Sequence, residues 1–212
     1  MSQESPTTRR IHGQDADQRR QARREALLDA ALDLFARHGF HQVSVDQICQ
    51  TATVSTKSFY GIFRSREDCY LALHNHVTEQ VMTQLAEVIE QTPAGVEPPV
   101  SALIEAFAAP YLHEPRYGTV LFGKGAAVTP TIDRLRRENR QWGAEFVVTI
   151  WRDTHPEVDV PAGVAIGVVG GLFEIIRQWS KGDLDPDTLR TELRSFYDAT
   201  HQGLFGRRAT RH

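Results

Sequence analysis

The segment of residues 44–63 carries the signals for two short helices separated by only a few residues. In Ser44-Val-Asp-Gln47, the serine hydroxyl can accept a hydrogen bond from a free backbone N–H while the glutamine reaches back, which is a capping box. This box predicts a helix over 45–51, and Ser55 caps a second helix that reaches about Phe63. A connection as short as 52–54 between two such helices is typical of a helix-turn-helix unit.

Longer helices are predicted on both sides of this pair. Before it, apolar residues recur at i, i+4, i+7 and i+8 within 23–38, and Gly39 follows as a helix C-cap. After it, Ser65-Arg-Glu-Asp68 is another capping pattern and predicts a helix over 66–91. That helix keeps one apolar stripe for six turns: Tyr70, Leu73, Val77, Val81, Leu85 and Val88.

The second short helix has two different faces. Thr56, Lys57 and Ser58 occupy its first turn, from which they can reach base edges or phosphates if the helix enters a DNA major groove. Phe59 and Phe63 are spaced i, i+4 and lie on the other side. We expect one face to pack on the chain and the other to contact DNA.

The stretch LLDAALDLFARHGFHQVSVDQICQTATVSTKSFYGIFRSREDCYLAL, residues 27–73, resembles without a gap the DNA-binding domain of the tetracycline-repressor (TetR) family of transcription regulators. The chain also resembles the family in its length and helical layout. The resemblance implies that Ser44, Tyr60 and Arg66 contact phosphates and that Thr56, Lys57 and Ser58 face the groove. Ser55, which caps the second short helix, completes the predicted set of DNA-contacting residues.

The sequence departs from the family pattern at several positions. Thr53 stands where the turn usually has Gly, so the backbone must place a non-Gly residue in a less favourable conformation or use another turn geometry. Cys49 replaces the usual Ala; we interpret it as a small buried residue, with redox sensing as the alternative. Gly61 and Ile62 replace a pair that is commonly aromatic or His. The operator sequence is therefore not inferred from the family.

The rest of the chain is divided by prolines and glycines into segments of helical length. These segments predict helices over 99–112, 115–125, 130–154, 162–181 and 186–204. The predicted fold is all-α with about nine helices: a three-helix helix-turn-helix DNA-binding domain followed by a larger helical ligand-binding and dimerisation domain. The predicted divisions are a basic flexible arm (1–22), the DNA-binding domain (23–66), the effector-binding and dimerisation domain (67–206) and a tail (207–212).

The family resemblance implies that the last two helices form a homodimer interface. Small residues beside a bulky stripe in 162–181, and heptad-like spacing in 186–204, give each helix an apolar seam, and four such helices can form a bundle. The alternative is that the seams pack within one chain. The predicted interface residues are Val168, Leu172, Ile175, Trp179, Leu189, Leu193, Phe196 and Leu204.

The resemblance also implies an effector pocket among the helices of 66–181. Asn139 interrupts an apolar stripe there and places an amide where a ligand can form a hydrogen bond, although a surface or core Asn is the alternative interpretation. The aromatic residues of this part are candidates for the lining or for plain core. The predicted pocket residues are Tyr111, Tyr117, Phe122, Asn139, Trp142 and Phe146.

Two other classes of function compete with this interpretation. A helical enzyme would rest on His74, His76, His113 and Glu114, but their spacing matches no catalytic or metal-binding motif, so no catalytic residue, metal or cofactor is predicted. An architectural DNA-binding protein without an effector is the second alternative. The preferred hypothesis is a homodimeric transcription regulator, a repressor that a small and largely apolar effector releases from a palindromic double-stranded operator.

Composition is consistent with a cytoplasmic protein. The formal net charge is −3, and the two cysteines, Cys49 and Cys69, form neither a C-x-x-C motif nor a group with His, so no disulfide framework is predicted. The longest run without a charged residue, 160–173, has 14 residues, whereas a membrane-spanning helix needs about 20. The N-terminal residues lack the apolar core of a signal peptide. We therefore expect neither a membrane partner nor export.

Overall fold

The computed structural model describes residues 6–93, 95–122, 129–183 and 185–206, with side chains from residue 16 onward, and this part of the chain is helical without a strand. The all-α prediction is confirmed. The elements are α1 (Pro6–His38), a 3-10 turn η1 (Phe40–Gln42), α2 (Val45–Ala52), α3 (Thr56–Tyr60), α4 (Arg66–Glu90), α5 (Val100–His113), α6 (Arg116–Phe122), α7 (Pro130–Thr154), α8 (Ala162–Gln178), a π turn η2 (Trp179–Asp183) and α9 (Pro186–Phe205).

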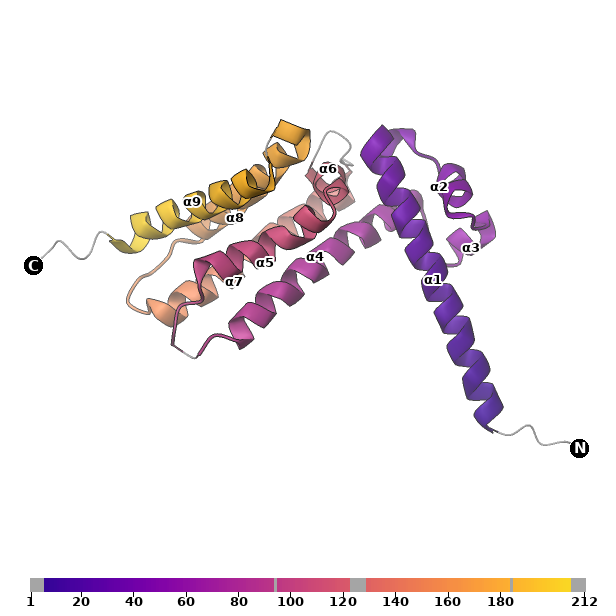
Figure 1. The fold of residues 1–212 in the computed structure, drawn as a ribbon, viewed down its shortest axis with the longest axis horizontal. Coiled ribbons are helices and arrows are strands. Elements are labelled where there is room, and N and C mark those ends of the chain that lie inside the picture. Colours follow the sequence, from indigo (N-terminus) through magenta and orange to yellow (C-terminus); the bar gives the residue numbers. More distant parts are fainter. Residues whose placement is uncertain (1–5, 94, 123–128, 184, 207–212) are drawn as a thin grey trace, which may run out of the picture.

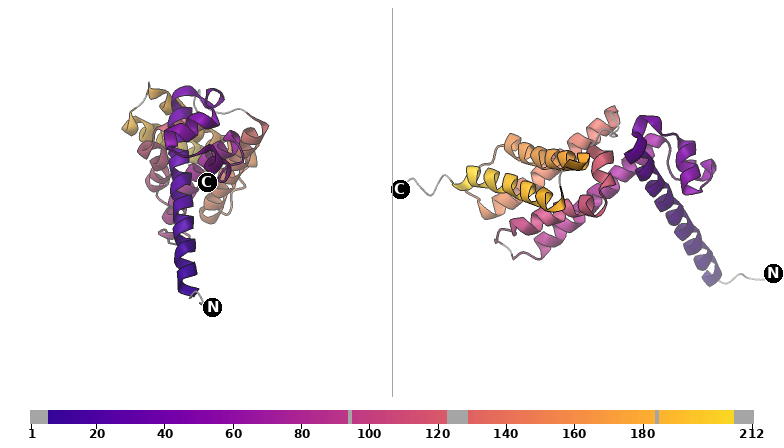
Figure 2. Two further views of the ribbon diagram at one scale, coloured as in Figure 1. Left: turned by 90° about the vertical axis from the view of Figure 1, so that its right-hand side faces the viewer. Right: turned by 45° about the horizontal axis from the view of Figure 1, so that its top comes forward.

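Helices α1, α2 and α3 gather at one end of an elongated molecule, and α5 to α9 form a larger body at the other (Figure 1). Helix α4 begins beside the small group and runs into the body (Figure 1). The N-terminal half of α1 projects away from the rest of the chain in every view (Figure 2). One continuous helix, α4, therefore joins the two ends of the molecule.

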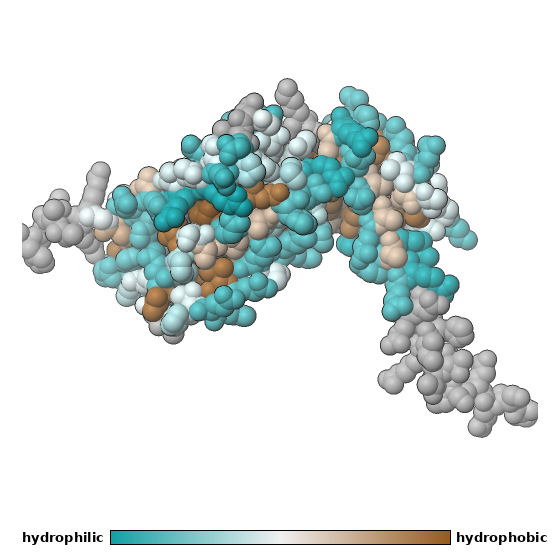
Figure 3. Space-filling view, in the orientation of Figure 1, coloured by the Kyte–Doolittle hydropathy of each residue, from teal (hydrophilic) through white to brown (hydrophobic). Residues whose placement is uncertain are grey.

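The surface differs between the projecting helix and the larger body. The described side chains of α1 that extend beyond the small group are hydrophilic, whereas hydrophobic residues are visible between hydrophilic ones on the body (Figure 3). In the sequence this part of α1, residues 16–22, contains Asp, Gln and Arg with two Ala, one at each end. The projecting part of α1 therefore has no apolar face with which to pack on its own chain.

Side-chain caps fix the helix starts: the serine caps are those that the sequence predicts, and the structure adds a threonine and an aspartate cap. Ser44 and Gln47 form the complete capping box of α2, with Ser44 N donating to Gln47 Oε1 at 2.7 Å. Ser65 Oγ accepts from Asp68 N at 3.0 Å, but the Asp68 carboxylate accepts from Arg64 N rather than from Ser65. Helices α7 and α9 start at Pro130 and Pro186, after side-chain caps from Thr129 and Asp185.

The two ends share one hydrophobic core that α4 extends through the molecule. The rings of Phe35, Phe40 and Tyr70 meet with centroids 5.4 to 5.7 Å apart, which joins α1, η1 and α4. The predicted stripe of α4 is buried from Tyr70 to Leu85 and half-buried at Val88. Because residues of both ends of the molecule pack on α4, a movement of α4 affects the packing at both ends.

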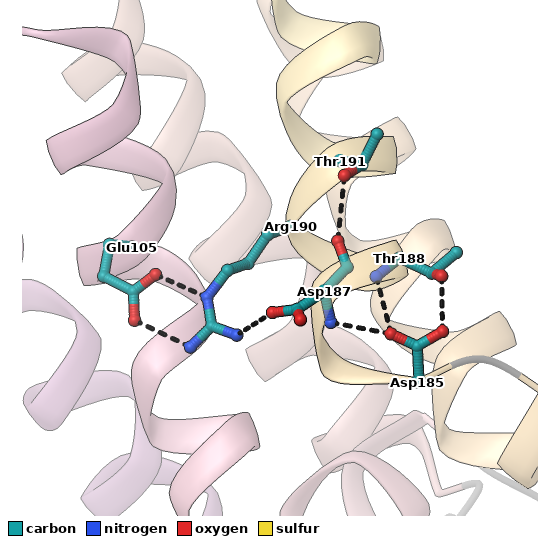
Figure 4. Close-up of polar contacts among 6 residues, drawn as sticks. All are labelled: Glu105, Asp185, Asp187, Thr188, Arg190 and Thr191. Atoms are coloured by element: carbon teal, nitrogen blue, oxygen red, sulfur yellow. Dashed lines mark hydrogen bonds and ion pairs between the residues drawn. The ribbon is translucent and has the colours of Figure 1, made fainter.

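Helix α9 is fixed to the body by packing and by an ion pair. Arg190 donates to the Glu105 carboxylate of α5 from Nε at 2.7 Å and from Nη2 at 3.1 Å, and it also lies 3.3 Å from Asp187 (Figure 4). Gly171 of α8 lies against the Phe196 ring so closely that a Cβ there would come within 2.2 Å of it. Small residues in α8 thus let α9 approach.

Most of the residues predicted for the dimer interface are buried within the single chain. Leu189 and Leu193 have no exposed surface, and Val168, Leu172 and Trp179 are at most 7% exposed in the single chain. Ile175, Phe196 and Leu204 are partly buried and pack against the same core. The two apolar seams face inward because α8 packs on α7, and α9 packs on α5 and α8, within the same chain.

Two helix boundaries differ from the sequence prediction. Helix α1 begins at Pro6 rather than near Arg23, so the predicted flexible arm is helical from residue 6, where Ala, Gln and Arg favour a helix even without a core to pack on. Helix α3 ends at Tyr60 rather than Phe63 because Gly61 follows as its C-cap. Residues 1–5, residues 123–125 of the predicted 115–125 helix and the tail at 207–212 lie outside the described part.

The segment Ala162–Gly182 is long and apolar enough to cross a membrane by length and composition. Its residues Val168, Leu172 and Ile176 are buried against the other helices, and 33% of its 18-residue window is buried in the chain. The predicted helix over 130–154 is confirmed as α7.

Candidate nucleic-acid interface and effector cavity

Helix α3 has one packed and one free face. Phe59 is fully buried and Phe63, just beyond the helix, is 3% exposed, so both rings anchor the unit in the core. On the opposite side Thr56 and Lys57 are exposed, and Tyr60 is 57% exposed. A free face with a cation, a hydroxyl and a phenol at the tip of the molecule is suited to contact with phosphates and base edges.

The three serines of the predicted DNA-contact set hold the local backbone. Ser55 Oγ accepts from Ser58 N at 3.2 Å and lies 2.9 Å from Ser58 Oγ. Ser44 Oγ accepts from Gln47 N at 3.2 Å, and the residue itself is exposed. The Ser44 and Ser55 hydroxyls fix the starts of α2 and α3 by accepting hydrogen bonds. Because both residues are exposed, a hydroxyl proton can still be donated to an acceptor outside the protein, such as a phosphate.

Thr53, in the turn between α2 and α3, has φ 55° and ψ 39°, which is the left-handed helical conformation. It is the one non-glycine residue with positive φ among the described residues. Of the two alternatives considered for this position, the structure shows the first, a non-Gly residue in a conformation better suited to Gly. A threonine here costs about 1–2 kcal/mol relative to an unstrained backbone.

Arg66 differs from the other predicted phosphate contacts. Its guanidinium lies over the Phe40 ring, 4.4 Å from the centroid, and donates a short hydrogen bond to the Val43 carbonyl. The side chain thus clamps the start of α4 onto the turn before α2. Sequence reasoning missed this role, because the residues that hold Arg66 lie more than twenty positions earlier.

Basic residues of α1 lie on the same end of the molecule. Arg20, Arg23 and the neighbouring Arg19 are exposed, and Arg20 Nη2 approaches the Gly61 carbonyl to 3.5 Å, just beyond α3. This contact places positive charge of α1 beside the end of the exposed helix. Positive charge near a reading helix strengthens attachment to the phosphate backbone.

A cavity of about 220 Å³ lies in the larger body, between α4, α5, α6, α7 and α8. Its walls are mainly apolar, and its exposed members Arg140, Trp142 and Glu174 lie where α7 and α8 meet the solvent. The structure places five predicted pocket residues in this wall: Tyr111, Phe122, Asn139, Trp142 and Phe146. Tyr117 does not line it; its ring lies 6.4 Å from that of His76.

Three hydrogen-bonded polar side chains lie in this wall, of which the sequence analysis assigned only Asn139 to the pocket. Asn139 Nδ2 donates to Thr78 Oγ1 at 3.1 Å and lies 3.3 Å from His74 Nδ1. The Thr78 hydroxyl donates to the His74 carbonyl at 3.1 Å, so its oxygen is free to accept from Asn139. His74 and Thr78 are separated by four residues on one face of α4, and only the fold brings Asn139 of α7 to them.

His74 is neutral in this setting. It is 4% exposed, and burial together with the positive charge of Arg136 lowers its pKa to about 4. Because Nδ1 accepts from Asn139, the proton of the neutral ring is on Nε2. That nitrogen is buried and has no hydrogen-bond partner within the described chain.

The remaining candidates for chemistry are scattered. His76 lies 3.1 Å from Gln80, His113 is exposed, and Glu114 binds Arg116 at 2.7 Å, so the histidines considered for an enzyme do not meet around one point. Cys49 and Cys69 are both buried, and burial raises the pKa of Cys49 and raises that of Cys69 to about 12. A raised pKa disfavours the reactive thiolate and so argues against redox sensing.

Comparisons with known proteins agree with this geometry. Residues 27–73 match the family described as bacterial regulatory proteins, tetR family. The regulator TcmR of Streptomyces glaucescens is 28% identical over 223 residues, which covers 95% of this chain and 94% of that protein. The transcriptional activator FasR of Mycolicibacterium smegmatis is 24% identical over 172 residues, covering 80% and 78%.

Solved structures show the same fold. A TetR-like transcriptional regulator from Rhodococcus sp. RHA1 superposes with a TM-score of 0.68 at 21% identity, covering 87% of this chain and 96% of that one. The fatty acid degradation regulator FadR from Bacillus halodurans gives 0.69 at 19% identity, covering 86% and 96%. The chain therefore belongs to the tetR family of bacterial regulatory proteins and is a DNA-binding transcriptional regulator of the helix-turn-helix type.

Proposed function

We propose that the protein is a cytoplasmic homodimer that binds a palindromic operator through α3 and represses transcription until a small, largely apolar effector enters the cavity. The observation that carries the effector part is the buried polar group of His74, Thr78 and Asn139 in an otherwise apolar cavity. Such a pocket, with a few converging polar atoms, is typical of small-molecule sites. An architectural DNA-binding protein would have no use for this arrangement.

The DNA part rests on the exposed first turn of α3. Lys57 and Thr56 are exposed where a recognition helix reads base edges, and Tyr60 at the next turn is within reach of a phosphate. Ser44 and Ser55 support these residues by capping α2 and α3, and the Ser58 hydroxyl lies 2.9 Å from that of Ser55. For Arg66 we propose a structural role in place of a phosphate contact, because its charged group is already bound to Val43 and Phe40.

The domain division proposed for the chain follows from these roles. Residues 23–66 carry the proposed DNA contacts and 67–206 carry the cavity, although α4 and the shared core make the two parts mechanically continuous. Arg19 and Arg20 of α1 add exposed positive charge rather than a separate unit. Helix α4 would then transmit a movement of the effector domain to the DNA-binding helices.

The chemistry of the cavity restricts the effector. A neutral His74 with an unpartnered Nε2–H offers one buried hydrogen-bond donor, so the ligand needs an acceptor such as a carbonyl or ether oxygen at that point. Aromatic and aliphatic side chains, among them Phe107, Phe122 and Phe173, supply the rest of the surface. We infer an apolar molecule with at least one acceptor oxygen.

We propose that the dimer forms through the faces of α8 and α9 that the single chain leaves open. On α8, Ile166 is 39% exposed, and an added Cβ at Gly163, Gly167 or Gly170 would meet no atom within 4 Å. On α9, the exposed residues include Ser195, Ala199 and Gln202. An isologous contact of this surface would place two α3 helices on opposite half-sites of a palindrome.

The experiment that tests the DNA part is selection of bound sequences from a random double-stranded library. We expect an inverted repeat with half-sites about 34–36 Å apart between centres. Lys57→Ala should lower affinity for the selected site by about 1–3 kcal/mol and relax one base position. Tyr60→Phe should lower affinity for all sequences alike. A single half-site bound as tightly as the repeat would contradict the proposed symmetry.

The sign of regulation needs a separate measurement, because FasR is named an activator. A reporter gene placed behind the selected operator should be expressed less when the protein is present than when it is absent. Higher expression with the protein present would replace repression by activation and leave the DNA-binding assignment intact.

A further inference from the structure

Three side chains from distant parts of the chain converge at the end of the body away from the DNA-binding helices. Glu97 precedes α5, His155 is the C-cap of α7 and His201 lies in the last turns of α9. One ring nitrogen of each histidine and one carboxylate oxygen of Glu97 lie within 4.8 Å of one another. Two imidazoles and a carboxylate meeting at one point form a ligand set for a metal ion.

The converging atoms are buried and unsatisfied. Glu97 Oε1 and the Nε2 atoms of His155 and His201 have no hydrogen-bond partner among the described residues. His201 Nε2 and Glu97 Oε1 lie 3.0 Å apart, which is an ion pair only when His201 is protonated, and they form no hydrogen bond. Buried polar atoms left without a partner cost free energy, so three of them at one place need an explanation. One cation between them would satisfy all three.

Aromatic rings hold both imidazoles in place. The His155 ring stacks on Phe205 with centroids 4.2 Å apart, and the His201 ring stacks on Tyr197 at 6.0 Å. Tyr197 is itself fixed by a hydrogen bond of 2.9 Å from Trp151 Nε1. His155 Nδ1 also lies 4.0 Å from the Glu157 carboxylate, on which a metal-bound imidazole can orient. The ligand rings are therefore positioned by their surroundings.

Ligand type decides which ion fits. Mg²⁺ and Ca²⁺ prefer oxygen ligands throughout, whereas imidazole nitrogen favours zinc and its neighbours among the transition metals. Zinc bonds of about 2.0–2.2 Å require ligand atoms roughly 3.5 Å apart in a tetrahedron. The Glu97 and His201 atoms already lie closer than that, and the 4.8 Å limit leaves about 1 Å to be closed by side-chain rotation.

We propose that Glu97, His155 and His201 form a divalent transition-metal site, with Zn²⁺ as the preferred ion and water in the open fourth position. The ion would tie the end of α9 to the end of α7 and to the segment that leads into α5. The sequence did not reveal this site because its ligands are separated by 58 and 46 positions and match no short motif. The proposal does not depend on DNA or effector binding.

The test uses the full-length protein after treatment with a chelator and its removal. Zn²⁺ is titrated in competition with a chromophoric chelator, and Co²⁺ is added separately as a spectroscopic probe. We expect one ion to bind per chain. Bound Co²⁺ should absorb visible light with the spectrum of a low-symmetry coordination site. His155→Ala, His201→Ala and Glu97→Gln should each weaken Zn²⁺ binding at least tenfold. Zn²⁺ should raise the unfolding temperature of the wild type and of no ligand variant.

The matched control is His113→Ala, which removes an exposed histidine away from the cluster and should bind Zn²⁺ like the wild type. Glu97→Gln is nearly isosteric, so it keeps the test valid if a histidine variant fails to fold. No stoichiometric binding by the wild type, or equal affinity in the wild type and Glu97→Gln, would overturn the proposal. Loss of binding in His113→Ala would assign the ion to another site and overturn it as well.

Discussion

The hydroxyl of Thr129 donates a hydrogen bond of 2.5 Å to the Glu67 carboxylate and thereby joins the N-cap of α7 to the first turn of α4. Both helices line the cavity further along, α4 with His74 and α7 with Asn139. On the other side of Glu67 lies Arg66, which holds the turn before α2. A ligand that separates α4 from α7 therefore pulls on a contact next to the DNA-binding helices.

Replacing Glu67 by Ala should weaken the communication between cavity and operator. The ratio of operator affinities without and with effector should fall by roughly 2- to 30-fold, the range in which single residues along a coupled path act. Fluorescence anisotropy with labelled operator measures this ratio. Glu67→Gln keeps an oxygen that accepts from Thr129 and serves as the control, with a ratio near that of the wild type. An unchanged ratio in Glu67→Ala would show that coupling takes another route.

A second route is visible at the junction of α1 and α6. Arg116 lies 3.3 Å from Asp29 and 3.6 Å from Asp33, and it also holds Glu114 at 2.7 Å. Persistence of coupling in Glu67→Ala would direct attention to this cluster, which is partly exposed and therefore sensitive to salt.

Thr53→Gly should stabilise the protein. The left-handed backbone at Thr53 costs a threonine about 1–2 kcal/mol, and glycine adopts it without that penalty, although it loses more chain entropy on folding. We expect the free energy of unfolding to rise by about 1 kcal/mol in urea denaturation. Gln50→Gly, in the exposed interior of α2, should lower it by about 0.5–1 kcal/mol. A loss of stability in Thr53→Gly would refute the strain at this turn.

The sequence predicted most helices because caps and breakers act locally. Ser44, Ser65, Thr129 and Asp185 start helices through their own side chains, and Pro130 and Pro186 fix the first helical residue, so these boundaries were predictable. The direction of an apolar seam is a different matter. Periodicity shows that Leu189 and Leu193 share a face, but only the packed chain shows that this face is covered by α5 and α8.

The candidate site divides along the same line. The exposed face of α3 could be predicted because Phe59 and Phe63 must point inward, which leaves Thr56 and Lys57 outside. The contact of Asn139 with His74 in the cavity could not be predicted. The two residues are 65 positions apart and meet only when α4 and α7 enclose the same space.

His74 should make stability depend on pH between about 6.5 and 4. Its folded-state pKa lies below the unfolded value, so in this interval the unfolded chain binds a proton that the folded chain does not. The contribution of neutral His74 to the free energy of unfolding is fully present above pH 6.5. It is lost as pH falls, and at pH 4 the loss is about 3 kcal/mol. In His74→Gln the free energy of unfolding should fall less steeply over this interval, measured by urea denaturation at several pH values.

The control for this measurement is His113→Gln, since His113 is exposed and does not line the cavity. Identical slopes for wild type and His74→Gln would mean that His74 is hydrated or charged in the folded protein. The inferred donor at Nε2 would then be wrong.

Gly167→Glu should convert the proposed dimer into a monomer. A Cβ added at this position meets no atom of its own chain within 4 Å, so the fold should be retained, as circular dichroism would show. Two carboxylates in a closed interface repel each other by several kcal/mol. Sedimentation equilibrium should give a monomer, with operator affinity lost in parallel. Ser101→Glu, exposed on α5, is the control and should remain dimeric.

A dimeric Gly167→Glu would move the interface away from the open face of α8, whereas a monomeric variant with full operator affinity would separate dimerisation from DNA binding.

The central claim is that ligand binding in the cavity and operator binding weaken each other. It is tested most directly by titrating one ligand with and without operator DNA. The ligand is taken from an apolar, oxygen-containing library by thermal shift, and its binding must be lost in Asn139→Leu. Linkage requires the operator to weaken the ligand by the same factor by which the ligand weakens the operator, here about 5- to 150-fold. Equal ligand affinity in the two titrations would contradict the account and leave the cavity without a role in regulation.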